Sequence, residues 1–480
     1  MRYRSVLVAI LSALSVTGCM FHGDTPTAEA PQSFSIVNTS APEKNLPENP
    51  WWKEVGSQEL DSLVSEALEN NKQISIARKN IEIAQSSLDT VKLGWLPSLS
   101  IMAGPIRSNG LVLLPNLPMP LAGTGSFLAF LPTWMVNVIQ LPSRTKEAEK
   151  NVEISVAEFL AMRASIAAQV VSSYALLLAC IEEENILNAL KKNVSAQLST
   201  ARSMTLRGLN TEVSTNEQDS YLQKIDAQVV TNHANKIAAK NALLTLVGRP
   251  LTHFTPSERF GTLKLDSIAP GNTPTSVLAS RPDVAAARAK IQATDYGLSA
   301  TASLFAPTLT WAGASLNASA NVNGTRERLT ETVQLGLLTW TLDPQFIGKV
   351  ISANKQYDGE IIRYFSVVEN AMKEVDNALA DFEAKKTSLV KQENALANSR
   401  KNMKTYQAML KNGLLSETQY LQTVGQFDQA NMAIVQTKLQ TIISLSKLYQ
   451  SMGGGATYGQ QQYRLKNQSI AGISRDNTQK

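Results

Sequence analysis

Residues 77–99 read ARKNIEIAQSSLDTVKLGWLPSL, and residues 287–309 read ARAKIQATDYGLSATASLFAPTL, so that one pattern returns after 210 residues. Farther along the chain the offset becomes 205 residues. The matched pairs include Leu88 with Leu298, Pro97 with Pro307, Gly208 with Gly413, Glu212 with Glu417 and Gly248 with Gly453. Several identities at a nearly fixed spacing indicate a tandem duplication. We therefore predict two structural repeats joined by a linker rich in Pro and Gly.

Each repeat is expected to run through a helix, a β-hairpin, a very long helix, a tight turn and a returning helix. The opening helix of the first repeat is predicted over residues 60–93, and the very long helix of the second repeat over residues 360–412. In the first repeat no Pro or Gly occurs between Ser143 and Arg207. A continuous helix of that length spans roughly 95 Å at about 1.5 Å per residue. Its apolar residues recur at coiled-coil spacing until Gly208, and in the second repeat Gly413 interrupts the same pattern. Each repeat is thus predicted to contribute an antiparallel coiled-coil hairpin.

The strands are predicted from segment length. Thr308–Ala318 and Glu331–Leu342 in the second repeat each have about eleven residues, the length of a tilted strand that crosses a bilayer. The first repeat has matching segments at Ser98–Ser108 and about Gly125–Gln140. Residues 105–132, which overlap the facing ends of these two segments, are more apolar than a water-exposed loop requires. An apolar loop folded against a neighbour and a shifted strand register are both open interpretations of this stretch.

Four strands cannot close a barrel, because bacterial barrels have at least about eight and an open sheet edge is unstable in lipid. Beyond the N-terminus no uninterrupted run approaches the roughly 18 apolar residues of a spanning helix. The barrel is therefore expected to be shared between copies of the chain. Three copies would give twelve strands, and their helical hairpins could close a cylinder. The predicted fold class is thus a mixed α/β membrane protein, and with three copies it is a trimeric 12-stranded β-barrel continued by a long α-helical coiled-coil barrel.

The N-terminus carries two arginines, then an apolar stretch, then Gly18-Cys19. It resembles a bacterial lipoprotein signal, which implies cleavage after residue 18 and covalent lipid, diacylglycerol and an N-acyl group, on Cys19. An ordinary secretory leader is the alternative interpretation. Met20 follows the cysteine in place of Asp, which by this resemblance directs the protein to the outer membrane. Residues 19–50 are predicted to be an extended tether.

The composition limits the chemistry. A formal net charge of +5 and an 18% share of charged residues are too mild to indicate nucleic-acid binding. Two cysteines, Cys19 and Cys180, exclude a disulfide framework, and three scattered histidines form no cluster with metal-ligand spacing. The sequence has no nucleophile-elbow motif and no phosphate-binding loop. We therefore predict no enzyme activity, no metal and no cofactor other than the covalent lipid.

Several short motifs occur in a fixed order along the duplicated scaffold. They are Pro50-Trp51-Trp52, Arg281-Pro282-Asp283-Val284, Phe305-Ala306-Pro307, Trp340-x-Leu342-Asp343, Gly413-Leu414 and Leu448-Tyr449-x-x-Met452-Gly453-Gly454-Gly455. Together they resemble the TolC-like outer-membrane efflux family, in its lipoprotein branch from multidrug efflux systems. The resemblance implies a homotrimeric, passive duct for small molecules in the outer membrane of a Gram-negative bacterium. It also implies two partners, a periplasmic adaptor (membrane fusion) protein and an inner-membrane pump of the resistance-nodulation-division type.

The resemblance assigns roles to the two tight turns. Gly208-Leu209 and Gly413-Leu414 would dock the adaptor, although a glycine that only ends a helix has the same sequence. Relatives often carry aspartates six and nine residues after the second turn glycine, where this chain has Gln419 and Gln422. The first repeat has Glu217 at the later of these positions. These residues remain gate candidates, but the departure argues against a strongly acidic gate.

Glu212 and Glu417 follow the turn glycines by four residues. In a trimer these carboxylates would bias the local potential toward cations, so both are candidates for a periplasmic gate. Acids near a helix N-terminus also complement the helix dipole, and this structural interpretation is compatible with the first.

Two other functions fit the same architecture: the outer-membrane duct of a type I protein secretion system, and a non-conducting lipoprotein scaffold. The predicted boundaries are 1–18 for the signal peptide, 19–50 for the tether, 51–254 for the first repeat with its β-hairpin at about 98–140, 255–275 for the linker, 276–455 for the second repeat with its β-hairpin at about 308–342, and 456–480 for a polar tail.

Overall fold

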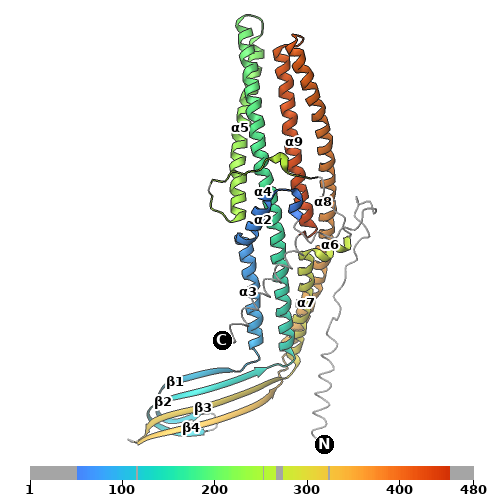
Figure 1. The fold of residues 1–480 in the computed structure, drawn as a ribbon. Coiled ribbons are helices and arrows are strands. Elements are labelled where there is room, and N and C mark those ends of the chain that lie inside the picture. The colour runs from blue at the N-terminus through green and yellow to red at the C-terminus, as the bar shows by residue number, and fades with distance from the viewer. Residues whose placement is uncertain (1–50, 115–116, 252, 266–273, 323–324, 455–480) are drawn as a thin grey trace, which may run out of the picture. The chain divides into compact units, whose positions relative to one another are not determined.

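The computed structural model describes residues 51–114, 117–251, 253–265, 274–322 and 325–454 (Figure 1). The predicted signal peptide, the lipid site at Cys19, the tether and the polar tail lie outside these residues. Residues 266–273 of the predicted linker also lie outside the described residues.

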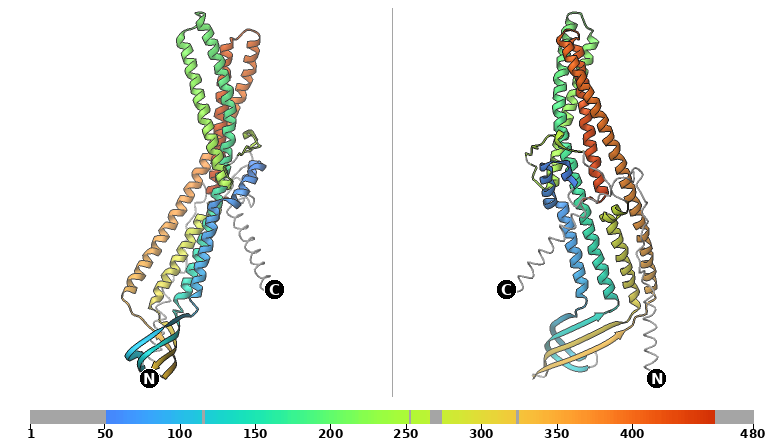
Figure 2. Two further views of the ribbon diagram at one scale, coloured as in Figure 1. Left: turned by 90° about the vertical axis from the view of Figure 1, so that its left-hand side faces the viewer. Right: turned by 45° about the vertical axis from the view of Figure 1, so that its right-hand side comes forward.

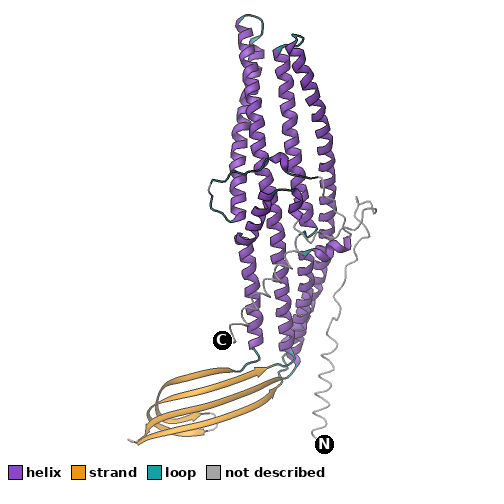
Figure 3. Cartoon of the chain, viewed as in Figure 1, coloured by secondary structure: helices purple, strands orange, loops and turns teal. Residues whose placement is uncertain are grey.

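The elements follow the order expected of a duplicated chain (Figure 1), and Figure 3 distinguishes its helices from its strands. The first repeat contains η1 (Trp51–Val55), α2 (Gln58–Asn70), α3 (Lys72–Leu93), β1 (Ser98–Leu114), β2 (Leu117–Val136), α4 (Gln140–Leu206) and α5 (Glu212–Val247). After η2 (Phe260–Thr262), the second contains α6 (Pro274–Ser280), α7 (Pro282–Ala302), η3 (Ser303–Phe305), β3 (Thr308–Val322), β4 (Thr325–Thr339), α8 (Gln345–Lys411) and α9 (Glu417–Ser451). The mixed α/β class and the duplication are confirmed. The long helices α4 and α8 have 67 residues each.

Two helix boundaries differ from the prediction. The helix expected over residues 60–93 is broken at Asn71, whose backbone is extended. The Asn71 side chain accepts hydrogen bonds from the backbone N–H groups of Gln73 and Ile74, so it caps α3. The long helix α8 begins at Gln345 instead of Glu360. Glycine inside a helix costs only about 1 kcal/mol, so the glycines before residue 360 do not stop it.

The four strands form one antiparallel sheet in the order β1-β2-β3-β4. Representative Cα partners are Ser98 with Thr133 between β1 and β2, and Thr308 with Thr339 between β3 and β4. The order places β1 and β4 at the two edges of the sheet, so each has one side without a strand neighbour in the part of the chain that the structure describes.

The stretch at 105–132 is not a loop, because β1 continues to Leu114 and β2 begins at Leu117. The prolines of this stretch are the reason that its sequence also allows a loop. Pairing of β2 with β3 starts only at Thr124, so Pro118 and Pro120 lie where β2 has β1 as its single neighbour. Proline lacks a backbone N–H and is tolerated at such an unpaired edge. The second hairpin also has longer strands than predicted, and its strands extend to Val322 and from Thr325.

The chain divides into two compact units. One contains the sheet, within residues 80–155 and 286–365, and the other contains residues 51–79, 156–285 and 366–454 of the described chain. In the second unit Tyr174, Leu178, Phe382 and Ile442 are among the buried side chains. Among the described helices, α4 alone contains an 18-residue stretch apolar enough to cross a membrane, and 67% of that stretch is buried. We therefore assign its apolar residues to helix packing.

Candidate functional site

Both helical hairpins turn through the same hydrogen-bond motif. At the end of α4, Gly208 N–H donates to Thr205 O at 3.0 Å and Leu209 N–H donates to Met204 O at 2.9 Å. The equivalent bonds after α8 start from Gly413 and Leu414. Gly208 and Gly413 have φ of 69° and 72°, the left-handed conformation that this C-terminal cap requires. The predicted tight turns are therefore present at both positions.

Both turn glycines have free space where a side chain would stand. A Cβ atom on either glycine would meet nothing within 4 Å. Leu209 and Leu414, the residues that follow, are exposed apolar side chains. Exposed leucines beside unobstructed backbone are features of a surface that a partner can approach closely.

The candidate gate residues lie on the helices that leave the turns. Thr211 caps α5 by accepting from Ser214 N–H at 3.3 Å. Ser416 and Gln419 form a reciprocal capping box at the start of α9, so Gln419 has a structural role. The other candidates are exposed, and none of the ion pairs found among the described residues includes them: Glu212, Glu217, Glu417 and Gln422.

Glu212 and Glu417 are the first residues of α5 and α9. This position agrees with their interpretation as acids that complement the helix dipole. The structure does not bring the two carboxylates together within one chain.

A second repeated feature lies where each returning helix ends. The α5 terminus uses Gly248, with φ of 81°, and a Cβ there would lie 2.9 Å from Asn70 O. Asn71 Nδ2 donates to Leu246 O at 2.8 Å, while the same side chain caps α3. We call this contact between the α2–α3 break and the end of α5 the first joint.

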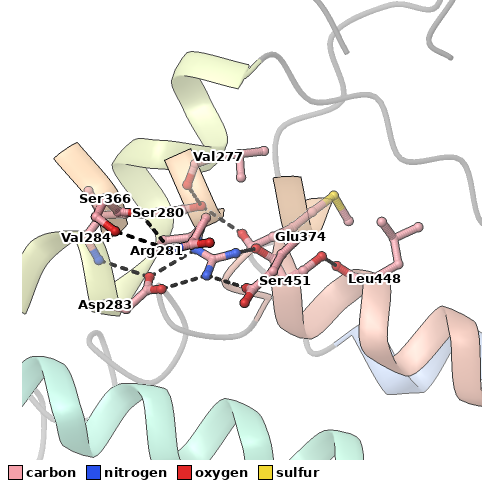
Figure 4. Close-up of polar contacts among 11 residues, drawn as sticks. Val277, Ser280, Arg281, Asp283, Val284, Ser366, Glu374, Leu448 and Ser451 are labelled. Carbon is pink, nitrogen blue, oxygen red and sulfur yellow. Dashed lines mark hydrogen bonds and ion pairs between the residues drawn. The ribbon is translucent and has the colours of Figure 1, made fainter. Parts of the chain in front are cut away.

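The second joint has the same geometry with a charged residue (Figure 4). The α9 terminus uses Gly453, with φ of 73°, and a Cβ there would lie 2.8 Å from Ser280 O. Arg281, only 7% exposed, donates from Nη1 to Ser451 O and forms ion pairs with Asp283 and with Glu374 on α8. Arg281 therefore ties the start of α7 to both helices of the second hairpin.

The positive charge of Arg281 is stabilised by its neighbours although the side chain is buried. Burial by itself opposes the charge, but the hydrogen bonds and negative charges of Asp283 and Glu374 outweigh it and raise the pKa of Arg281. Arg281 lies 210 residues after Asn71, and Ser451 lies 205 residues after Leu246. One repeat thus closes its joint with an amide and the other with a guanidinium.

The N-terminal segment packs on the end of the second repeat. The Trp51 ring stacks on the Tyr449 ring with centroids 4.8 Å apart, and Tyr449 OH donates to Glu54 Oε2 at 3.1 Å. Burial, followed by the nearby Glu54 charge, raises the pKa of Tyr449. The Trp51 motif and the Tyr449 motif therefore belong to one packed cluster.

The sequence model of the outer membrane efflux protein family matches residues 63–249 and 273–454, one match for each repeat. The chain belongs to the outer membrane efflux protein family. It is accordingly a protein of the outer membrane of a Gram-negative bacterium and not an enzyme.

Relatives of this efflux protein cover nearly its whole length. Toxin and drug export protein A of Aggregatibacter actinomycetemcomitans is 20% identical over 94% of this chain and 98% of its own. Cation efflux system protein CusC of Escherichia coli O157:H7 is 20% identical over the same shares. Among solved structures, the open state of the MtrE outer membrane channel of Neisseria gonorrhoeae has a TM-score of 0.75 and 18% identity, covering 90% of this chain and 97% of that one.

Among the described residues of this efflux protein, the buried cysteine has a packing role. Burial raises the pKa of the Cys180 thiol to about 11, so it is protonated and shielded at neutral pH. Within the described residues no group of three potential metal ligands occurs. The sequence alone does not predict the joints, since Arg281 stands out only as part of a motif and Asn71 carries no signal beyond its preference for helix caps.

Proposed function

We propose that this protein is the channel component of a tripartite efflux system, a passive homotrimeric duct that conducts small molecules from an adaptor and an inner-membrane pump to the exterior. The observation that carries the proposal is the four-stranded sheet whose edges, β1 and β4, have no further strand partner among the described residues of the chain. A membrane-spanning sheet needs every edge paired, so further copies must supply the missing strands.

Three copies fit this requirement. They supply twelve strands, an even number within the range of about 8 to 26 found in bacterial barrels. Their six helical hairpins would form a ring of twelve long helices. The similarity to solved outer-membrane channels supports such a shared channel.

Two measurements on the purified protein test the proposal: its native mass tests the trimer, and its conductance tests the open path. We expect native mass spectrometry of the detergent-extracted protein to give three chains, each carrying diacylglycerol and an acyl group on a Cys19 N-terminus. The same sample in a planar bilayer should give small, discrete conductance steps. A monomer would rule out the shared barrel, and a trimer that never conducts would support the non-conducting scaffold.

The adaptor is proposed to bind the two turns, and the pump to be of the resistance-nodulation-division type. Support comes from the exposed Leu209 and Leu414 and from the open space beside the turn glycines. A docked adaptor would remove these leucines from water, a gain of about 1.5–3 kcal/mol for each fully buried side chain.

Changing both turn leucines to aspartate should abolish export while leaving the channel intact. Charged residues would have to be desolvated on docking, so adaptor binding is lost. The measurement is accumulation of a fluorescent pump substrate in cells, with single-channel conductance taken from the same variant. Val390→Asp, at an exposed apolar position on α8 outside the turns, is the control. Normal export by the Leu209→Asp/Leu414→Asp variant would argue that the adaptor binds elsewhere.

Protein secretion is the second candidate function. It is favoured by one relative, whose name assigns it both toxin and drug export. A cell lacking this protein would then retain a secreted polypeptide, whereas the efflux function predicts accumulation of small molecules. Comparing the two in a deletion strain separates the candidates.

A further inference from the structure

The helix α4 lies between α5 and α9 (Figure 1, Figure 2). On one side Asn232 Nδ2 of α5 donates to Cys180 O of α4 at 2.8 Å. On the other, Asn193 Nδ2 of α4 donates to Leu421 O of α9 at 3.0 Å. Closer to the ends of α5 and α9 the same three helices line a groove of about 670 Å³. Small-molecule sites in proteins usually measure about 300–1,000 Å³.

The lining of this groove is small and apolar at its base. Ala168 and Ser446 are buried there, with 4% and 1% of their surface exposed. Leu246 and Ile443 add larger apolar side chains that are half-buried. Lys447 lines the groove from an exposed position and carries its only charge among the described lining residues. The remaining lining residues are alanine, serine, threonine and glutamine.

The charge of Lys447 has no counter-charge at the groove. None of the ion pairs found in the described part of the chain includes this lysine. Binding sites for small molecules combine apolar walls with a few polar groups that fix the orientation of the ligand. An apolar groove with one uncompensated cation therefore matches a molecule that has an apolar body and one anionic group.

The groove and the N-terminal elements lie on opposite faces of the helices. Tyr174 on α4 donates a hydrogen bond to a glutamate of α2, and Tyr449 on α9 donates one to a glutamate of η1. Two lining residues of the groove, Ser172 and Lys447, each precede one of these tyrosines by two positions. At about 100° per residue they point about 200° away from the tyrosines.

We propose that this groove faces the interior of the duct and binds small apolar anions during their export. The inference rests on the proposed function and names a substrate class that contacts the wall of the duct. The sequence before Trp51 leads to the proposed lipid on Cys19, and such a lipid is held by the bilayer. The N-terminal elements therefore lie on the outer side of the duct, which leaves the groove on the inner side.

The exposure of Lys447 suits a site along an exit path. A conducting path needs sites that attract the passing molecule and release it again. An exposed ion pair strengthens binding by about fivefold at most. The groove would thus favour anions over cations of the same shape without retaining them.

Binding of naphthalenesulfonate to the full-length protein in lipid nanodiscs tests the groove. Isothermal titration calorimetry gives the dissociation constant and the number of bound molecules. We expect Lys447→Gln to weaken binding about fivefold, because the ion pair is lost. Ala242→Trp, at an exposed lining position on α5, should weaken it about tenfold by filling the groove with an indole ring.

The matched control is Lys224→Gln, which removes the same charge from another exposed position of α5. Lys224 precedes Ala242 by 18 residues. This spacing is about five helical turns, so both residues lie on one side of α5, about 27 Å apart. We expect Lys224→Gln to bind naphthalenesulfonate as the wild type does, with three molecules per trimer.

Two probes with the same ring test the class of ligand. The cation naphthylmethylammonium and the uncharged naphthalenemethanol should bind at least about fivefold more weakly than the sulfonate. Equal binding of naphthalenemethanol would assign the groove to neutral apolar molecules such as lipid chains and would overturn the anionic class. An unchanged affinity in both Lys447→Gln and Ala242→Trp would overturn the groove as the binding site.

Single-channel conductance of the same samples separates the groove from the duct. In a conducting wild-type channel naphthalenesulfonate should lower the current, and Lys447→Gln should need about five times more of it for the same block. A channel that conducts but neither binds the sulfonate nor is blocked by it would overturn the groove and leave the duct standing. A protein that binds the sulfonate but never conducts would overturn the duct, and with it the placement of the groove inside.

Discussion

Replacing Arg281 with alanine is expected to speed amide hydrogen exchange at the end of α9 about thirtyfold, which corresponds to a local loss of about 2 kcal/mol. The guanidinium is buried, and its removal leaves Ser451 O without its donor. Asp283 and Glu374 are about half exposed, so water replaces most of what their ion pairs provide. Exchange measured by mass spectrometry on peptides covering Ser451 reports the effect.

Arg281→Asn is the informative companion, because it installs the residue of the first joint. Asn71 already shows that an amide at this position can donate to the equivalent carbonyl. We expect Arg281→Asn to retain most of the protection of the α9 end while losing the link to Glu374. If Arg281→Ala and the wild type exchange at the same rate, the second joint does not hold the hairpin.

Alanine at Gly453 is expected to destabilise the protein by about 3 kcal/mol, against about 1 kcal/mol for alanine at Gly413. Both glycines have nearly the same φ, 73° and 72°, so both substitutions strain the backbone equally. They differ in their surroundings, since a Cβ on Gly453 would lie 2.8 Å from Ser280 O and one on Gly413 would meet open space. The difference between the two variants therefore isolates the steric part.

The first repeat provides an independent replicate. Gly248 and Gly208 form the same buried and open pair, with the Cβ of Gly248 placed 2.9 Å from Asn70 O. Thermal unfolding followed by circular dichroism in one detergent gives the ranking. Equal losses at Gly453 and Gly413 would mean that the joint yields to a methyl group and that close approach is not needed there.

Local pattern predicted most of the fold. The repeat, the two hairpins and the turns at Gly208 and Gly413 follow from offset identities and from the absence of Pro and Gly over long stretches. The strands at 105–132 did not, because a proline is compatible with a strand only where its missing N–H is not needed, at an unpaired edge or a break in the pairing, and those places depend on how β3 pairs with β2.

The turns could be predicted as candidate sites because their residues are close together in sequence. The joints could not. The partners of Arg281 lie 93 and 170 residues away, at Glu374 and Ser451. No local pattern reports such a pairing, although the motif around Arg281 marked the position.

The equal length of α4 and α8 restricts how this chain can change in size. One residue inserted into α4 alone would turn every side chain beyond it by about 100° and advance it by about 1.5 Å. Asn193 would then no longer face Leu421. Seven residues complete about two turns and restore the facing, so viable insertions or deletions are confined to near-whole turns made at matching places in both repeats. Because of the duplication, a later change in the length of one repeat thus requires a matching change in the other.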